Sequence, residues 1–184
     1  MFTRLCIATV VVAVLTGLST SDASAQLVVR GIARLPARVT GVSSDDYYGF
    51  GFGGSVGFNL PIGKRSLFLG ARGVYHTGKK SSAGVDVTDT GLLMYGLEFG
   101  TAFIEKPFIL RSVGWVGVAS ESTKNLTSGT LVSKLTNNKF LFGPGLLFAV
   151  PIGPVQLGLE PRYLRVIGGT SSYVLYGSLG LNID

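Results

Sequence analysis

Charged residues are scarce in this chain. Only 14% of its 184 residues are Asp, Glu, Lys or Arg, whereas 46% are hydrophobic, and the net charge is +6 at pH 7. An average soluble domain contains about a quarter charged residues, so the composition argues against an ordinary cytosolic enzyme. After residue 25, however, no apolar run approaches the ~20 residues that a membrane-spanning helix requires. An apolar chain without such a helix favours strands in contact with lipid.

Cysteine and histidine are almost absent as well. The single cysteine is Cys6 and the single histidine is His76. The usual zinc sites require several such side chains, so we expect no metal site. Cys6 falls in an N-terminal segment that we expect to be removed, so disulfides cannot hold the exported protein together. We expect no cofactor either, because the glycine-rich stretches lack the Lys-Ser/Thr ending of a phosphate-binding loop.

The N-terminal segment has the layout of a secretory signal. Arg4 precedes an apolar stretch over residues 5–18, and a polar region then ends in Ala23-Ser24-Ala25. Small residues in this arrangement are typical of a signal-peptide cleavage site. We therefore predict a cleaved signal peptide over residues 1–25 and a single β-barrel domain over residues 26–184.

Glycine is abundant, and its positions are periodic. Between Tyr47 and Ile62, large apolar residues occupy alternate positions, and the positions between them hold mostly glycine. Only a two-residue period sorts them in this way, and each glycine would cost a helix ~1 kcal/mol relative to alanine. The same pattern predicts eight strands, at residues 27–37, 47–62, 66–77, 91–104, 108–119, 139–150, 155–166 and 172–183.

The connections between these segments alternate in length. The short turns contain proline, and they lie at residues 61–64, 105–107 and 151–154. The longer connections are polar and span residues 38–46, 77–90 and 120–138. Short turns on one side and long loops on the other are typical of outer-membrane barrels. We therefore predict an all-β, eight-stranded, antiparallel up-and-down transmembrane β-barrel in a bacterial outer membrane.

Charged residues also occur on the glycine-rich phase of the strands, which we expect to face the barrel interior. The clearest are Arg72, Glu98, Glu160 and Arg162, each about five to seven residues from a short turn. Their charges balance two against two, and an unpaired buried charge would cost several kcal/mol. We predict an ionic network that fills the middle of the lumen. Further candidates for it are Arg30, Arg34 and Arg111.

Together, the signal segment, the eight periodic segments, the proline-marked turns and the central Arg/Glu residues resemble one family. They are similar to the small outer-membrane β-barrels of the OmpA-like transmembrane and OmpX-like type. The resemblance covers the whole mature chain and implies insertion by the outer-membrane assembly machinery. Family members commonly end on an aromatic residue, whereas this chain ends Leu181-Asn182-Ile183-Asp184.

The first functional hypothesis is a non-enzymatic barrel with a structural or surface-interaction role. We expect outer-membrane lipid and lipopolysaccharide as its surroundings, with the loop over residues 120–138 as the surface for any further partner. Basic side chains in the outer loops suit lipopolysaccharide phosphates. They are Lys79, Lys80, Lys124, Lys134 and Lys139. Nucleic-acid binding is not expected, because the basic residues are dispersed along the chain.

Three alternatives remain. A narrow channel for small solutes is favoured by the glycine-lined lumen but opposed by the central charges. A soluble lipocalin-like carrier would have its aromatic faces turned inward, but the only tryptophan, Trp115, lies far from the early Gly-x-Trp position of such carriers. A lipid A-modifying enzyme would use His76 with Ser81 or Ser82, although no spacing requires that arrangement.

Overall fold

The computed structural model describes residues 25–35, 48–62, 65–83, 86–127, 130–168 and 171–183. The predicted signal peptide lies outside these ranges except for Ala25, and so does the loop predicted at residues 38–46. The strands are β1 (Gln26–Leu35), β2 (Tyr48–Ile62), β3 (Arg65–Ala83), β4 (Asp86–Ile104), β5 (Ile109–Thr127), β6 (Thr130–Phe142), β7 (Gly145–Ile152), β8 (Val155–Val166) and β9 (Ser171–Ile183). Among the described residues, no helix has the length and apolar character needed to cross a membrane.

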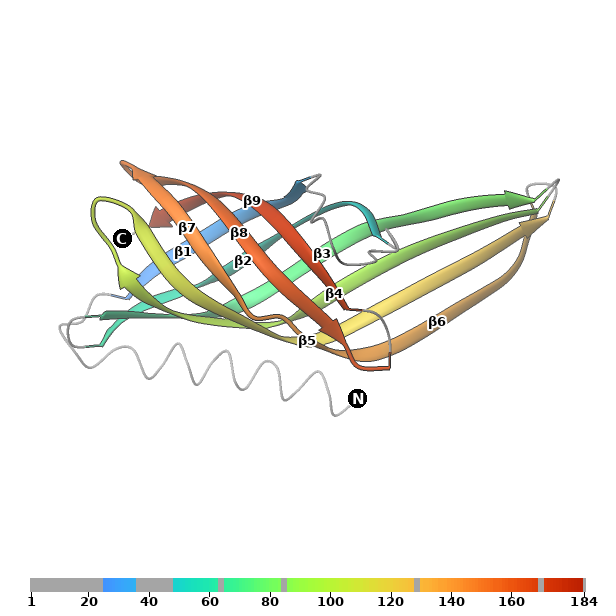
Figure 1. Cartoon of the computed structure of the whole chain (residues 1–184), viewed down its shortest axis with the longest axis horizontal. Helices are drawn as coiled ribbons and strands as arrows, with labels where there is room; N and C mark the ends of the chain where they lie inside the picture. Colours follow the sequence, from blue (N-terminus) through green and yellow to red (C-terminus); the bar gives the residue numbers. More distant parts are fainter. Residues whose placement is uncertain are drawn as a thin grey trace.

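The strands form one closed antiparallel sheet (Figure 1). Closure comes from β1 and β9, which pair from Leu27 opposite Ile183 to Leu35 opposite Leu175. β6 and β7 act as one strand of the wall, because both pair with β5 on one side and with β8 on the other. The ring therefore has the eight strands that the periodicity predicts.

The strand predicted over residues 139–150 is divided at Gly143 and Pro144, between β6 and β7. Proline has no N–H to donate to a β-ladder, and this interrupts the regular pairing. The wall nevertheless remains joined at this point. Trp115 and Gly143 exchange two backbone hydrogen bonds of 3.0 and 2.7 Å, and the Tyr163 N–H donates to the Pro144 carbonyl at 3.0 Å.

Four neighbouring strands continue beyond the barrel. β3, β4 and β5 each have 19 residues, whereas a tilted membrane strand needs about 9–11. In Figure 1 these strands and β6 project past the ends of β8 and β9. Pairing continues along the projection, with Lys80 opposite Asp89 and Thr127 opposite Thr130. We call this projection the outer sheet. It comprises residues 77–83, 86–91, 120–127 and 130–139.

The outer sheet corrects the prediction of long loops at residues 77–90 and 120–138. Most of both segments is paired strand. The prediction relied on apolar alternation, which a strand with water on both faces does not need. Thr, Ser and Val are frequent in these segments, and β-branched residues such as Thr and Val favour extended backbone.

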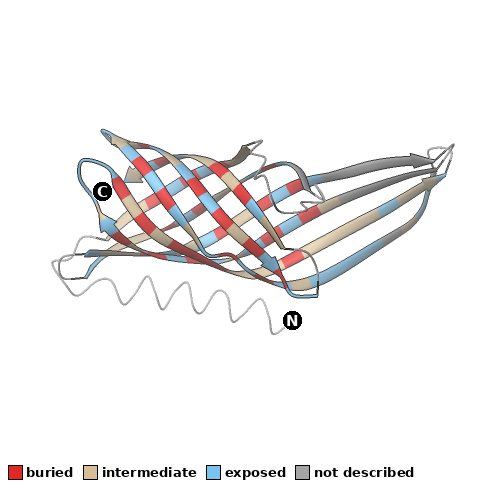
Figure 2. Cartoon of the chain, in the orientation of Figure 1, coloured by how far each residue is buried: buried red, intermediate tan, exposed pale blue. Residues whose placement is uncertain are grey.

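Within the barrel wall, many large apolar residues lie on the outer face and many small or polar residues on the inner face, the reverse of the arrangement in a soluble protein. Figure 2 shows buried and exposed residues alternating along the strands. On β2, Phe50, Phe52 and Val56 are exposed, whereas Gly51 and Ser55 are buried. The apolar face therefore points outward, which excludes the lipocalin-like alternative with its inward aromatic faces.

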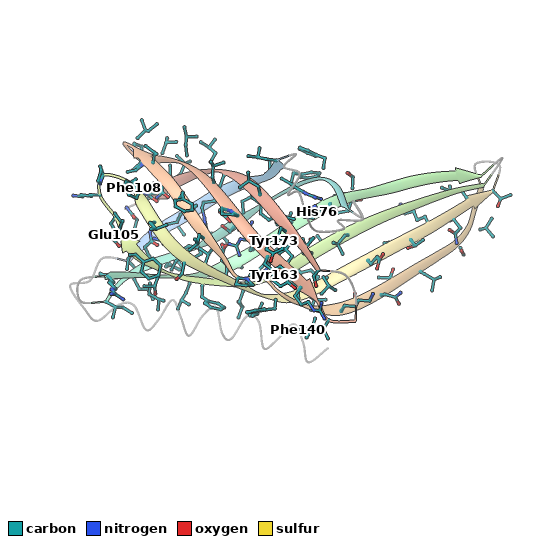
Figure 3. The ribbon with its side chains drawn as sticks, viewed as in Figure 1. His76, Glu105, Phe108, Phe140, Tyr163 and Tyr173 are labelled. Carbon is teal, nitrogen blue, oxygen red and sulfur yellow. The ribbon has the colours of Figure 1, made fainter. Side chains whose placement is uncertain are left out.

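Aromatic residues mark both ends of this outward face. In Figure 3, Phe108 lies at the end of the barrel that carries the β4–β5 turn, and Phe140, Tyr163 and Tyr173 lie nearer the outer sheet. The rings of Tyr163 and Tyr173 are 5.0 Å apart between centroids. Rings at both boundaries of an apolar face are typical of barrels at the lipid–water interfaces.

Inside the barrel, a charged layer lies between two apolar clusters. The cluster on the side of the short turns contains Ile109, Val113, Leu147 and Ala149. The cluster toward the outer sheet contains Ile32, Val74, Leu92, Met94, Trp115, Ala119, Leu141, Leu164, Val166, Val174 and Tyr176. The interior is therefore filled by side chains at three successive levels, as the bore of an eight-stranded barrel allows.

Candidate functional site

The four charged residues predicted for the lumen meet at its middle level. Arg72 comes from β3, Glu98 from β4, and Glu160 and Arg162 from β8, and all four are buried. Arg72 Nη1 lies 2.9 Å from Glu98 Oε1 and 2.7 Å from Glu160 Oε2. Arg162 Nε lies 3.2 Å from Glu160 Oε2, and its Nη2 pairs with Glu98. The ion pairs thus connect opposite parts of the wall.

Arg30 of β1 completes this group. Its Nη2 lies 2.6 Å from Glu98 Oε2, and its Nη1 lies 3.1 Å from Glu160 Oε1. Each carboxylate therefore contacts three guanidinium groups. Arg30 was among the further candidates that the sequence offered, and with it the network has three positive charges against two negative ones. We call these five residues the lumen network.

Aromatic rings contact two guanidinium groups of the lumen network, those of Arg72 and Arg30. The guanidinium carbon of Arg72 lies 5.2 Å from the Trp115 ring centroid and 4.9 Å from that of Tyr176. That of Arg30 lies 4.7 Å from the Phe68 ring. Cation–π contacts of this kind are worth about 0.5–2 kcal/mol. Sequence reasoning missed these rings, although they occupy the same inward phase as the charged residues.

The two remaining candidates are Arg111 and Arg34. Arg111 is buried on β5, with its guanidinium carbon 5.5 Å from the Phe68 ring. Arg34 is half-buried nearer the outer end of β1. Both extend the basic character of the lumen beyond the level of the two carboxylates.

The predicted lysines belong to the outer sheet. Lys124 is exposed on β5, and Lys139 is half-buried on β6, with its Nζ 3.9 Å from Glu121 Oε2. Lys79 and Lys80 lie in β3 and Lys134 lies in β6, but their side chains are outside the described residues. The strand register nevertheless places three of these lysines in line across the sheet. One row across the four strands consists of Lys80, Asp89, Lys124 and Lys134.

His76, the candidate catalytic base, is buried at the outer end of the lumen. Its Nε2 lies 3.1 Å from the Tyr176 hydroxyl oxygen. The side chains of Ser81 and Ser82 are outside the described residues. Within the described part of the chain, no group of three His, Cys, Asp or Glu side chains is placed to hold a metal ion.

No protein-family model and no curated protein matches the sequence. The fold is similar to that of a major outer membrane protein from Thermus thermophilus, with a TM-score of 0.60 and 13% identity over 87% of this chain and 100% of that chain. Neisserial surface protein A covers 89% of this chain and 99% of its own, at 17% identity and a TM-score of 0.48. Ail, the attachment invasion locus protein of Yersinia pestis, covers 87% and 96%, at 13% identity and a TM-score of 0.44.

The fold shared with the Thermus protein is that of a small outer-membrane β-barrel. The apolar outward face provides separate physical support, because a closed barrel satisfies all its backbone hydrogen bonds internally and can expose such a face to lipid. The chain therefore has the fold of the small eight-stranded outer-membrane β-barrels.

Proposed function

We propose that this chain is a non-enzymatic barrel whose lumen is closed and whose outer sheet binds phosphate-rich lipopolysaccharide at the cell surface. The observation that carries the proposal is the lumen network itself. Its buried side chains are joined by ion pairs from β1, β3, β4 and β8. An apolar cluster lies on each side of this layer.

Closure of the lumen follows from the cost of opening it. A hydrated ion crossing the middle level would have to separate the two carboxylates from the guanidinium groups. Among the described residues, these groups have no other ion-pair partner. Breaking a buried pair is strongly destabilising, about 3–5 kcal/mol. The narrow-channel alternative therefore requires a rearrangement of the lumen network.

The absence of enzymatic activity is also part of the proposal. A histidine base needs a nucleophile within hydrogen-bond reach and an orienting group behind it, usually a carboxylate. His76 contacts the hydroxyl of Tyr176, and its ring is buried within the lumen. This contact supports a packing role.

The outer sheet provides the surface for lipopolysaccharide. The row formed by Lys80, Asp89, Lys124 and Lys134 contains three basic residues and one acidic residue. Basic groups close to an anionic lipid surface each contribute about 1 kcal/mol of binding. The row lies beyond the length of strand that the membrane requires, at the level of lipid headgroups or above it.

Planar-bilayer recording tests closure. Purified protein that migrates as the folded, heat-modifiable form should give no steady conductance steps. The expected current is that of the bilayer alone, because the lumen network stays intact. Steady, reproducible ion steps from the wild-type protein would contradict a closed lumen.

Lipopolysaccharide binding is tested with the barrel in nanodiscs of zwitterionic lipid and with phosphorylated core oligosaccharide as the probe. Replacing Lys124 and Lys134 together by alanine should weaken binding about tenfold or more at low salt, from the loss of two charges at about 1 kcal/mol each. Lys106→Ala is the matched control, because Lys106 is exposed at the opposite, short-turn end. Equal binding by all three proteins would rule out the outer sheet as the binding surface.

A further inference from the structure

The buried charges of the lumen do not balance. Among the described residues, the buried charged side chains are Arg30, Arg72, Arg111 and Arg162 against Glu98 and Glu160. Three of these arginines share the two carboxylates. Arg111 forms no ion pair with a carboxylate of the described residues. Glu105, on the nearby β4–β5 turn, is exposed and accepts a hydrogen bond of 2.5 Å from the Ser66 hydroxyl.

Hydrogen bonding is unbalanced as well, because unpartnered buried donors outnumber unpartnered buried acceptors among the described side chains. Buried nitrogen donors without a partner are Arg30 Nε, Arg72 Nε, Arg72 Nη2, Arg111 Nε and Trp115 Nε1. By contrast, Asn59 Oδ1 is the unpartnered carbonyl or carboxylate oxygen among the buried side chains of the described residues. Native proteins leave few buried polar groups unsatisfied. The described lumen thus has both an excess of positive charge and an excess of donors.

The excess positive charge and the unpartnered donors occur together beside Phe68. The guanidinium carbons of Arg30 and Arg111 lie 4.7 and 5.5 Å from its ring centroid, so both cations contact the same ring. Arg30 uses both Nη atoms in the lumen network, which leaves its Nε without an acceptor. The Nε of Arg111 is also without an acceptor. Arg111 lies opposite Ala102 and Leu147 in the sheet, and neither side chain can accept a hydrogen bond.

We propose that a small monovalent inorganic anion of the halide type binds between Arg30 and Arg111, on the short-turn side of the lumen network. Such an ion accepts hydrogen bonds from both guanidinium groups and neutralises one of the two excess charges. A water molecule would satisfy the donors but leave the charge in place. Larger multivalent anions are disfavoured, because side chains fill the interior of an eight-stranded barrel. A closed lumen does not by itself require this ion, so the inference goes beyond the proposed function.

Thermal unfolding of the whole barrel in detergent tests the site. A ligand that binds only the folded state raises the unfolding midpoint with its concentration. At constant ionic strength, replacing gluconate by bromide at about ten times the dissociation constant should raise the midpoint by about 3–6 °C. Gluconate is too large for the site. The same midpoint in both salts would overturn the proposal.

Two variants locate the effect. Arg111→Met keeps the length of the side chain, removes the charge and should abolish the bromide response. Arg65→Met is the matched control, because Arg65 is exposed at the start of β3, and it should retain the full response. A bromide response that persists in Arg111→Met would place the ion elsewhere and refute the site.

A direct observation decides the question even if Arg111→Met fails to fold. Wild-type crystals grown in bromide should show an anomalous peak in contact with Nε of Arg30 and of Arg111. A fully ordered site without that peak, or with the peak only at the protein surface, would overturn the proposal. Conductance is measured separately, so the failure of the anion site is distinguishable from the failure of lumen closure.

Discussion

Leu97 in the barrel wall and Leu135 in the outer sheet have almost the same exposed fraction, 62% and 61%. Both lie in paired strands, Leu97 opposite Val116 and Leu135 opposite Thr123. Their neighbours along the chain differ. The residues two positions from Leu97 are Tyr95 and Phe99, whereas those two positions from Leu135 are polar. Equal exposure therefore occurs in two different settings, an apolar surface in the wall and a largely polar one in the outer sheet.

Carboxylates show the same contrast between the two regions. Glu98 is buried and contacts three guanidinium groups in the wall. Glu121, in the outer sheet, is partly exposed and has one lysine 3.9 Å away. The same residue type therefore contributes differently to stability in the two regions, because Glu98 is enclosed by packed side chains whereas Glu121 is partly exposed.

The largest expected effect comes from the same substitution made in each region. Glu98→Gln leaves buried guanidinium charges without compensation and should cost about 3–5 kcal/mol of unfolding free energy. Glu121→Gln should cost less than about 1 kcal/mol, because the pair is partly exposed. Urea unfolding in lipid vesicles measures both through the fluorescence of Trp115, the single tryptophan, which lies beside Arg72. Similar losses for the two variants would abolish the contrast.

An intermediate change in the free energy of unfolding is expected when Leu97 or Leu135 is replaced by arginine. Leu97→Arg puts a charge into the lipid-facing surface at the level of the lumen network and should cost about 2–4 kcal/mol. Leu135→Arg should change stability by no more than about 0.5 kcal/mol, as for ordinary surface substitutions. The same vesicle unfolding assay applies. A large loss for Leu135→Arg would mean that lipid also covers the outer sheet.

The smallest expected effect comes from alanine substitutions at two glycines of the wall. Both lie in the same region, so only the local packing differs between them. A Cβ at Gly96 would lie 2.1 Å from the Val116 carbonyl oxygen, whereas a Cβ at Gly73 meets no atom within 4 Å. Gly96→Ala should therefore cost about 1–3 kcal/mol through strain between β4 and β5. Gly73→Ala should be neutral or gain up to about 1 kcal/mol, because it restricts the unfolded chain.

Equal stability of the two glycine variants would show that the close approach of β4 and β5 at Gly96 is easily relaxed. Gly117 lies directly opposite Gly96 and is equally crowded, because a Cβ added there would lie 2.1 Å from the Tyr95 carbonyl oxygen. Gly117→Ala is therefore a replicate, which should match Gly96→Ala in sign and approximate size.

By itself, the sequence determined the faces of the wall. A two-residue period assigns each side chain to the lipid or to the lumen, and this was enough to predict the eight-stranded barrel and to place Arg72, Glu98, Glu160 and Arg162 inside it. It did not detect the outer sheet, where polar residues on both faces leave no apolar alternation. It also did not show the division of the sixth strand at Pro144.

Only the tertiary structure decided which inward residues meet. Periodicity specifies a face but not a level along the barrel, because the level depends on the stagger between neighbouring strands. The ion pair of Arg72 with Glu98 joins positions 26 residues apart, and that of Arg30 with Glu160 joins positions 130 apart. Closure of β1 on β9 brings Arg30 to the level of the two carboxylates. Arg111 lies beside Phe68 and forms no ion pair with a carboxylate of the described residues.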